Sequence, residues 1–277
     1  MAGNEQPLSK IEMKTSEKPV RGTAEWAVAT VDCCSGCSHG CRYCYARYDL
    51  VERRRLLTAE QWQICNISEE EVARRHPLYA GQVMFPTNHD ILPENLAACR
   101  TVIMNLLRVG NRVLVVSKPH LCCIEELCRD LQPYRDRLLF RFTITARNAG
   151  ILHFWEPQAP GYTERKVCLE LAFRQGFATS VSVEPMLDSG DVVAMVDELL
   201  PFVSHSIWLG RMNKIAERVR CETPEMQAEV ARIEREQDDG HINTLYRQLQ
   251  DIPVIRWKES IKTLVGLQLA AEPGLDV

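Results

Sequence analysis

The chain has 277 residues, of which 45% are hydrophobic, enough for one α/β barrel with a short appendage. A net charge of -4 excludes the global positive field of many nucleic-acid binders, and no apolar run approaches the roughly 20 residues that span a bilayer. Twelve cysteines in a long chain that starts with a polar stretch favour a reducing cytoplasm over a disulfide-bonded secreted protein.

Residues 1–23 carry charges, Ser, Thr and Pro without apolar periodicity, which predicts a flexible arm. Beyond this arm, short apolar runs alternate with longer helical patterns, and this alternation favours parallel strands joined by crossover helices. The predicted strands cover residues 26–31, 82–85, 112–117, 138–145, 179–184 and 206–209. The predicted helices lie near residues 45–58, 93–109, 121–134, 162–175 and 191–200.

Six strand and helix units predict a partial (β/α)6 barrel of the TIM type over residues 24–211. Residues 212–277 are expected to form a C-terminal helical extension on the same domain, because no Gly/Ser linker precedes them. Thr223 as N-cap and Pro224 in the first turn predict a helix through Glu236. A break at 238–240, a helix near 243–250 and a strand or closing segment at 252–257 follow.

Three cysteines, Cys37, Cys41 and Cys44, follow the first predicted strand in the spacing C-x3-C-x2-C. Three thiolates on a 4Fe-4S cube leave one iron without a protein ligand, whereas most electron-transfer clusters are closed by four cysteines. An open iron is a place to bind and activate a small molecule. The alternative is a zinc site, but its usual second pair of ligands does not follow here. Cys33 and Cys34, just before the motif, are expected to be packing residues.

The spacing, with aromatic Tyr43 just before the third cysteine, resembles the signature of the radical S-adenosylmethionine (SAM) superfamily. The resemblance implies that the open iron chelates the amino and carboxylate groups of SAM and that Tyr43 lies near the adenine. It also implies one-electron cleavage of SAM to methionine and a 5'-deoxyadenosyl radical, which removes a hydrogen atom from a substrate. An electron donor such as flavodoxin or ferredoxin is the implied partner.

Segments 36–46, 114–118 and 156–165 resemble the spore photoproduct lyase-like branch of this superfamily. This resemblance covers residues from about 26 to 211 and implies a lyase-like or other radical-mediated reaction. The resemblance leaves the substrate open: repair or modification of a DNA base competes with modification of an RNA, a peptide or a small molecule. The net negative charge disfavours extended contact with a nucleic acid, but one base flipped into a pocket needs only a small basic rim around that pocket.

Lyases of the photoproduct type are expected to use a cysteine as hydrogen-atom donor, but no further cysteine follows a predicted strand end. Cysteine is among the most buried residue types, so the other seven are expected to be core thiols. They are Cys65, Cys99, Cys122, Cys123, Cys128, Cys168 and Cys221.

The loop after the second predicted strand contains Thr87, Asn88, His89 and Asp90. Many members of the superfamily carry a Gly-Gly-Glu-like turn here that hydrogen-bonds the SAM amino group. That motif is absent, but these residues offer the acceptors that an ammonium group needs. The alternative is an Asx-type turn that caps the next helix.

Two basic residues are candidate partners of the SAM carboxylate. Lys118 follows the third predicted strand, and its alternative is a surface charge. Arg165 is the second candidate, because a guanidinium holds a carboxylate by two parallel hydrogen bonds; its alternatives are an i,i+4 helix pair or a solvent-facing charge. His39, inside the cysteine loop, is expected to face solvent and not to be a ligand.

Two other strand ends carry candidate SAM contacts. Thr143 and Thr145 lie in an alternating strand and are candidates for ribose or methionine contacts, or else β-branched filler of the barrel interior. Glu184 ends the fifth predicted strand and is a candidate acceptor for ribose hydroxyls. Its alternative is a salt bridge to Arg211 or Lys214.

The leading hypothesis is therefore a radical SAM enzyme that binds a 4Fe-4S cluster and SAM and acts on an unidentified substrate. The contrasting hypothesis is a non-enzymatic binding protein that zinc or a cluster stabilises and whose barrel is only structural.

Overall fold

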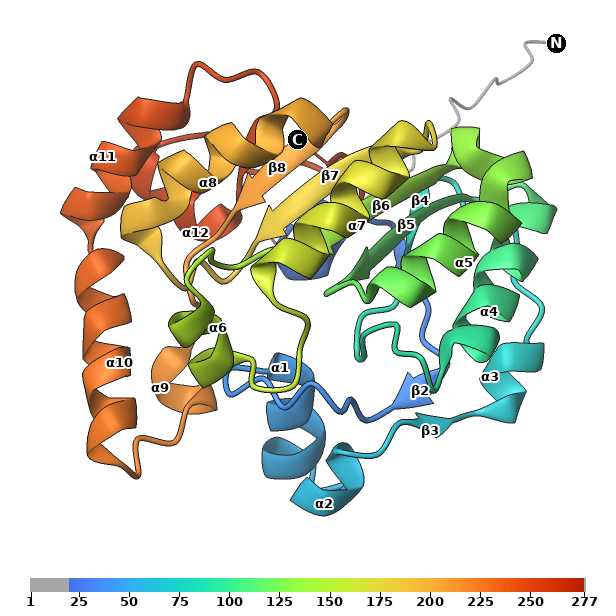
Figure 1. Cartoon of the computed structure of the whole chain (residues 1–277), viewed down its shortest axis with the longest axis horizontal. Coiled ribbons are helices and arrows are strands. Elements are labelled where there is room, and N and C mark those ends of the chain that lie inside the picture. The colour runs from blue at the N-terminus through green and yellow to red at the C-terminus, as the bar shows by residue number, and fades with distance from the viewer. Residues whose placement is uncertain (1–19, 277) are drawn as a thin grey trace, which may run out of the picture.

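The computed structural model describes residues 20–276, so the predicted arm at 1–23 lies outside the described residues except for 20–23. The chain forms a seven-stranded parallel sheet that curls into a half-barrel (Figure 1). Its order is β1-β4-β5-β6-β7-β8-β9, so each strand is added beside the previous one. The bounds are β1 Ala29–Thr30, β4 Gln82–Phe85, β5 Arg112–Ser117, β6 Leu138–Thr143, β7 Ala178–Val183, β8 Ser206–Leu209 and β9 Ile255–Trp257. The predicted α/β partial barrel is confirmed.

The strand predictions differ from the structure mainly at the first strand. The predictions at 82–85, 112–117 and 206–209 match, because each is a short, largely apolar run in the middle of the sheet. The first strand has only two residues, although Val28 N and Val31 N still donate to Gln82 O and Met84 O at 2.9 Å on either side of it. The segment predicted at 252–257 as a strand or closing segment supplies the seventh strand, β9, which pairs with β8.

The helices at 96–109, 121–131, 162–174 and 192–199 cover one face of the sheet, and each lies where the sequence predicted a helix (Figure 1). In α4 the buried residues include Cys99, Val102, Ile103 and Leu106, which form one stripe facing the sheet. Gly110 ends this helix with φ of 108°, a conformation that favours glycine. The four bounds are α4 Leu96–Val109, α5 Leu121–Leu131, α7 Tyr162–Arg174 and α8 Val192–Leu199.

The helix predicted at 45–58 starts where expected but ends at Arg53. The chain forms α1, Tyr45–Arg47, which runs into one π-helical stretch, Tyr48–Arg53. Thr58 then starts a new helix through a capping box with Gln61. This segment lies beneath the carboxyl ends of the strands (Figure 1). Its other elements are β2 Cys34–Ser35, α2 Ala59–Trp62, β3 Asn66–Ile67 and α3 Glu69–Ala73.

The helix predicted after Thr223 is confirmed. The side chain of Thr223 accepts a hydrogen bond from Met226 N at the start of α10, Pro224–Glu236. The break predicted at 238–240 falls at 237–238, where the Asp238 side chain caps the next helix at His241 N. The other helices are α6 Ala149–Trp155, α9 Ile215–Arg218, α11 Asp239–Leu249 and α12 Glu259–Val265.

The burial of the cysteines and the length of the helices test two further expectations. Cys122 and Cys221 are exposed, so the seven thiols are not all in the core. Within residues 20–276, no helix is both long enough and apolar enough to cross a bilayer.

The barrel interior contains a buried arginine. Arg141 on β6 is fully buried, lies over the rings of Trp26 (4.7 Å) and Trp208 (5.6 Å), and pairs with Asp276 at 2.8 Å. Asp276 thereby fastens the end of the described chain to the inside of the sheet.

We expect Asp276→Asn to lower the free energy of unfolding by about 3–5 kcal/mol, because it leaves a buried cation without its counter-charge. Urea denaturation measures the loss. The control is Asp136→Asn, since Asp136 is 93% exposed and its pair with Arg135 is a surface contact. Equal losses in the two variants would contradict the assignment.

Candidate active site at the carboxyl ends of the strands

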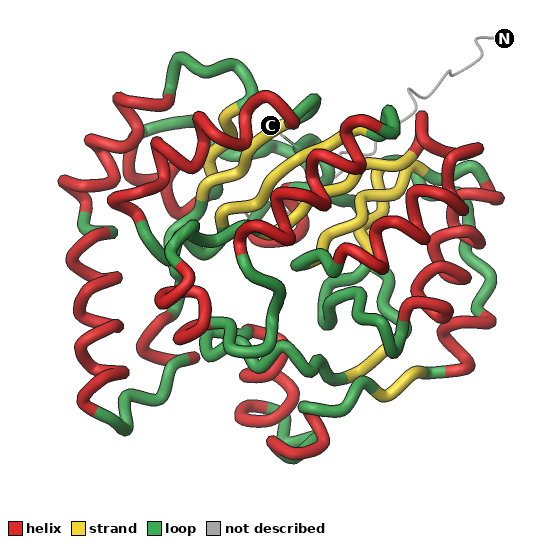
Figure 2. The backbone as a smooth tube through the Cα atoms, viewed as in Figure 1, coloured by secondary structure: helices red, strands yellow, loops and turns green. Residues whose placement is uncertain are grey.

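The cysteine loop lies between β2 and α1, among the loops beneath the carboxyl ends of the strands (Figures 1 and 2). Cys37 and Cys41 are buried, and Cys44 is the N-cap of α1, where its sulfur accepts from Arg47 N at 3.5 Å. Gly36 starts the loop with φ of 97°, and a Cβ there would lie 2.1 Å from the Ile64 carbonyl oxygen. Only glycine therefore fits this start of the loop.

The spread of the three sulfurs tests which metal group fits them. Within residues 20–276, the ligand atoms of Cys37, Cys41 and Cys44 do not all lie within 4.8 Å of one another. Tetrahedral zinc, with Zn–S of about 2.3 Å, holds its sulfurs about 3.8 Å apart. A cube that gives each thiolate its own iron needs a wider spread than one ion does. The three thiolates are therefore compatible with the donor set of a cube that has one open iron.

Asp90 is the centre of one charged network beside this loop. Its carboxylate accepts from Lys118 N at 2.8 Å and from Ser117 Oγ at 3.0 Å, and Lys118 Nζ lies 3.5 Å away. The same carboxylate pairs with His39 Nδ1 at 2.8 Å, and His39 Nε2 lies 2.9 Å from His120 Nε2. His39 is therefore buried, and the expectation that it faces solvent is wrong.

The two central charges of this network stabilise each other. Burial raises the pKa of Asp90, but Lys118 and His39 outweigh it and hold that pKa well below its usual range. Burial lowers the pKa of Lys118, but Asp90, Cys41, Tyr43 and Glu156 raise it well above its usual range. Lys118 is thus a fixed cation next to the cysteine loop.

Glu156 is the centre of a second network. It is buried and accepts hydrogen bonds from Tyr43 OH, from Thr145 Oγ1 at 2.9 Å and from Arg165 Nη2. Arg165 also donates to the carbonyls of Pro160 at 2.7 Å and Thr143 at 3.1 Å. Burial raises the pKa of Glu156, but Arg165 and Lys118 together lower it below the usual value. Arg165 is thus neither an i,i+4 pair nor a solvent-facing charge.

Thr87 and Asn88 are held by Asp32, a residue that the sequence did not point to. Thr87 N and Asn88 N donate to its Oδ1 at 2.6 and 2.8 Å, and Asn88 Nδ2 donates to its Oδ2 at 3.1 Å. The Thr87 carbonyl accepts from Tyr45 OH. His89 points elsewhere: its ring is buried, and its Nε2 lies 3.4 Å from Cys33 N.

Glu184 lies after β7 and pairs with Lys258, not with Arg211 or Lys214. Lys258 Nζ lies 3.6 Å from the Glu184 carboxylate and 2.7 Å from Glu25. Burial is the main cause that raises the pKa of Glu184, and Lys258 opposes it.

The structure thus gathers some of the predicted site residues and separates others. Tyr43, Lys118, Thr143, Thr145 and Arg165 lie in or next to the two networks, with Lys118 Nζ 5.8 Å from the centroid of the Tyr43 ring. Thr87 and Asn88 belong to the loop that Asp32 holds, Glu184 is tied to Lys258, and His89 turns away. The residues that sequence reasoning missed are Asp32, Glu156, His39 as a buried group, and His120. Of these, only Glu156 could have been found from the sequence, because it is the first residue of the 156–165 segment that resembles the spore photoproduct lyase-like branch.

Searches for similar proteins give a consistent result at the level of structure. A spore photoproduct lyase variant with bound AdoMet and dinucleoside spore photoproduct matches with a TM-score of 0.53 and 13% identity, over 82% of this chain and 75% of that chain. Another variant, with the dinucleoside spore photoproduct, matches with a TM-score of 0.56 and 13% identity over the same shares. SuiB from Streptococcus suis, bound to S-adenosylmethionine, matches with a TM-score of 0.54 and 6% identity, over 87% of this chain and 52% of that chain.

No protein-family model and no curated protein matches the sequence. At identities of 6% and 13%, the structural likenesses concern the fold. The fold is the one that the cysteine motif implied, and it is shared by the spore photoproduct lyase and SuiB structures at similar TM-scores. The chain therefore has the half-barrel fold of the radical SAM enzymes, the fold it shares with spore photoproduct lyase and SuiB.

Proposed function

We propose that this protein is a radical SAM enzyme. The observation that carries the proposal is the C-x3-C-x2-C loop, which lies beneath the strand ends of a half-barrel. Cys37, Cys41 and Cys44 would hold a 4Fe-4S cluster. When bound, that cluster and SAM supply the one-electron cleavage of SAM that generates a radical.

The chain's own residues hold and orient SAM in this proposal. Lys118, kept charged by Asp90, pairs with the SAM carboxylate, and Tyr43 flanks the adenine. Thr143, Thr145 and Glu184 are the proposed ribose and methionine contacts. Thr87 and Asn88 stay candidates for the amino group through the loop that Asp32 fixes, whereas His89 is withdrawn because its ring points away. Arg165 acts through Glu156 by fixing the hydroxyl of Tyr43.

The test is anaerobic reconstitution with iron and sulfide, followed by reduction with dithionite in the presence of SAM. We expect the visible absorption and the electron paramagnetic resonance signal of a 4Fe-4S cluster, and formation of 5'-deoxyadenosine. A chain that binds only zinc, or that builds a cluster but never cleaves SAM, would support the non-enzymatic binding protein instead.

We expect Lys118→Met to raise the KM for SAM by about 10- to 100-fold, because a charge-assisted hydrogen bond contributes about 1.5–3 kcal/mol. Steady-state formation of 5'-deoxyadenosine measures the change. The matched control is Lys166→Met on the outer helix α7, where Lys166 pairs with Glu198 at 2.7 Å. A normal KM in the Lys118 variant would remove this residue from the SAM site.

We further propose that the substrate is a nucleic-acid base. Two arginines pair with aromatic rings next to the cysteine loop: Arg42 lies 4.4 Å from the centroid of Phe154, and Arg218 lies 5.9 Å from that of Tyr45. Aromatic rings stack on bases while arginines contact phosphates, so these pairs form the small basic rim that one extruded base needs. Spore photoproduct lyase with its dinucleoside lesion is the structural precedent, and SuiB bound to its precursor peptide is the competing one.

A short fluorescent single-stranded oligonucleotide tests the substrate class. We expect Arg42→Ala to reduce the slope of log affinity against log salt by about 0.7, the value for one lost phosphate contact on a single strand. Arg75→Ala, at the exposed connection into the amino end of β4, is the control and leaves the slope unchanged. Absence of oligonucleotide binding, or an unchanged slope in the Arg42 variant, would rule out this rim.

A further inference from the structure

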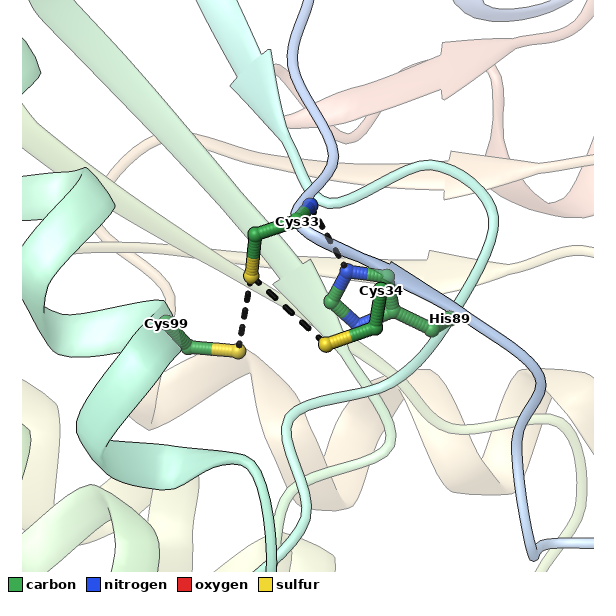
Figure 3. Close-up of side chains that lie close together, drawn as sticks. All are labelled: Cys33, Cys34, His89 and Cys99. Atoms are coloured by element: carbon green, nitrogen blue, oxygen red, sulfur yellow. Dashed lines mark hydrogen bonds between the residues drawn. The ribbon is translucent and has the colours of Figure 1, made fainter. Parts of the chain in front are cut away.

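A second group of sulfur and nitrogen ligands lies inside the core, apart from the C-x3-C-x2-C loop. Cys33, Cys34, Cys99 and His89 each place one ligand atom within 4.8 Å of all the others (Figure 3). All four residues are buried, and the His89 side chain has no exposed surface. They come from three segments: the stretch at the start of β2, the loop after β4, and helix α4.

The spacing of the sulfurs is that of ligands around one small ion. Cys33 Sγ lies 3.7 Å from Cys34 Sγ and 3.9 Å from Cys99 Sγ. A tetrahedral zinc ion with Zn–S of about 2.3 Å requires sulfurs about 3.8 Å apart. These distances exclude a disulfide, whose sulfurs lie about 2.05 Å apart. Three sulfurs and one imidazole also form one of the recurrent structural zinc sites.

The hydrogen bonds of His89 leave its ring ready to bind a metal. Its Nδ1 lies 3.0 Å from the carbonyl oxygen of Asp90, which only accepts, so Nδ1 carries the proton. Nε2 then carries the lone pair, which accepts only a long 3.4 Å hydrogen bond from Cys33 N, and the Asp32 carboxylate lies 3.9 Å from the same nitrogen. A metal-bound histidine that donates its other N–H to a carbonyl is the usual supporting arrangement in zinc sites.

We propose that Cys33, Cys34, Cys99 and His89 bind a structural zinc ion. A soft, mixed sulfur and nitrogen donor set of tetrahedral spacing favours zinc over magnesium or calcium, and four protein ligands leave no open position for catalysis.

The consequence of this site is to fix the groups that surround the cysteine loop. Cys34 stands three residues before Cys37, and His89 stands next to Asp90. One ion would therefore clamp the start of the loop and the Asp90 network to α4. Since the four ligands come from three segments, the ion adds a link that the half-barrel alone does not provide.

The zinc content and the iron content of the full chain, measured separately, test this proposal. We expect one zinc per chain by mass spectrometry in addition to the cluster iron. X-ray absorption at the zinc edge is expected to give three sulfurs at about 2.3 Å and one nitrogen at about 2.0 Å. Absence of zinc in the folded wild-type chain, or a shell of four sulfurs, would overturn the proposal.

Variants separate the two cysteine groups. Cys99→Ser is expected to lose the zinc, whereas Cys128→Ser, a buried thiol on α5 outside the group, is expected to keep it. A triple variant, Cys37→Ala, Cys41→Ala and Cys44→Ala, is expected to keep zinc without iron. Loss of zinc in the triple variant would overturn the proposal. The zinc content of the triple variant therefore tests the site even if the Cys99→Ser variant does not fold. Zinc without SAM cleavage would support this site while contradicting the proposed enzyme.

Discussion

We expect the Cys41→Ala variant to lose both the 4Fe-4S cluster and all cleavage of SAM. Cys41 is buried in the middle of the cysteine loop, and the other two cysteines leave two irons without a protein ligand. Burial raises the pKa of the Cys41 thiol well above its usual range, so this sulfur stays a neutral thiol until metal binding displaces its proton to solvent. The measurements are iron and sulfide content after reconstitution, the paramagnetic resonance signal, and 5'-deoxyadenosine by chromatography.

A matched control is Cys122→Ala, which removes an exposed thiol on α5 and leaves the loop intact. We expect its iron content and its SAM cleavage to equal those of the wild type. A Cys41→Ala variant that retains full iron content and cleaves SAM would show that the radical chemistry is built elsewhere. If the variant keeps zinc while it loses iron, the two metal sites are independent.

The sequence predicted the class of fold and the place of the cysteine loop because both depend on local signals. Continuous apolar runs such as 112–117 form central strands, and a loop directly after the first strand of a parallel barrel lies at the carboxyl ends of the strands. Local signals were also enough for the helix that Thr223 caps. They failed at 45–58, where a continuous helical pattern concealed the new start at Thr58.

The contact partners of the polar and sulfur-containing side chains could not be predicted, because they come from distant parts of the sequence that only the folded chain brings together. Cys33 contacts His89 and Cys99 across 56 and 66 residues, so two adjacent cysteines looked like packing residues. Lys258, the partner of Glu184, comes from the C-terminal part of the chain. Arg165 meets Glu156 although the two are nine residues apart, because the segment between α6 and α7 folds back on itself. Nothing in the spacing of these residues specifies such contacts.

The second large effect is expected for Glu156→Gln, which should lower the free energy of unfolding by about 3–5 kcal/mol. Glu156 and Arg165 have no exposed side-chain surface, so the substitution leaves a buried guanidinium without its counter-charge. Urea denaturation of the variant and the wild type at equal iron content measures the loss. The control is Glu170→Gln, whose pairs with Arg174 and Lys166 lie at the surface and are worth about 1 kcal/mol or less.

The double variant Glu156→Gln, Arg165→Met separates lost packing from uncompensated charge. A buried ion pair replaced by apolar groups is often near neutral, so the double variant should recover much of the stability that the single variant loses. The loss also has a defined pH dependence. Since folding lowers the pKa of Glu156 below 4.5, its stabilisation is complete above that value and disappears as the pH falls through the folded pKa. The difference between wild type and Glu156→Gln should therefore shrink in acid; a difference that is constant with pH would mean that the carboxylate charge is not what holds Arg165.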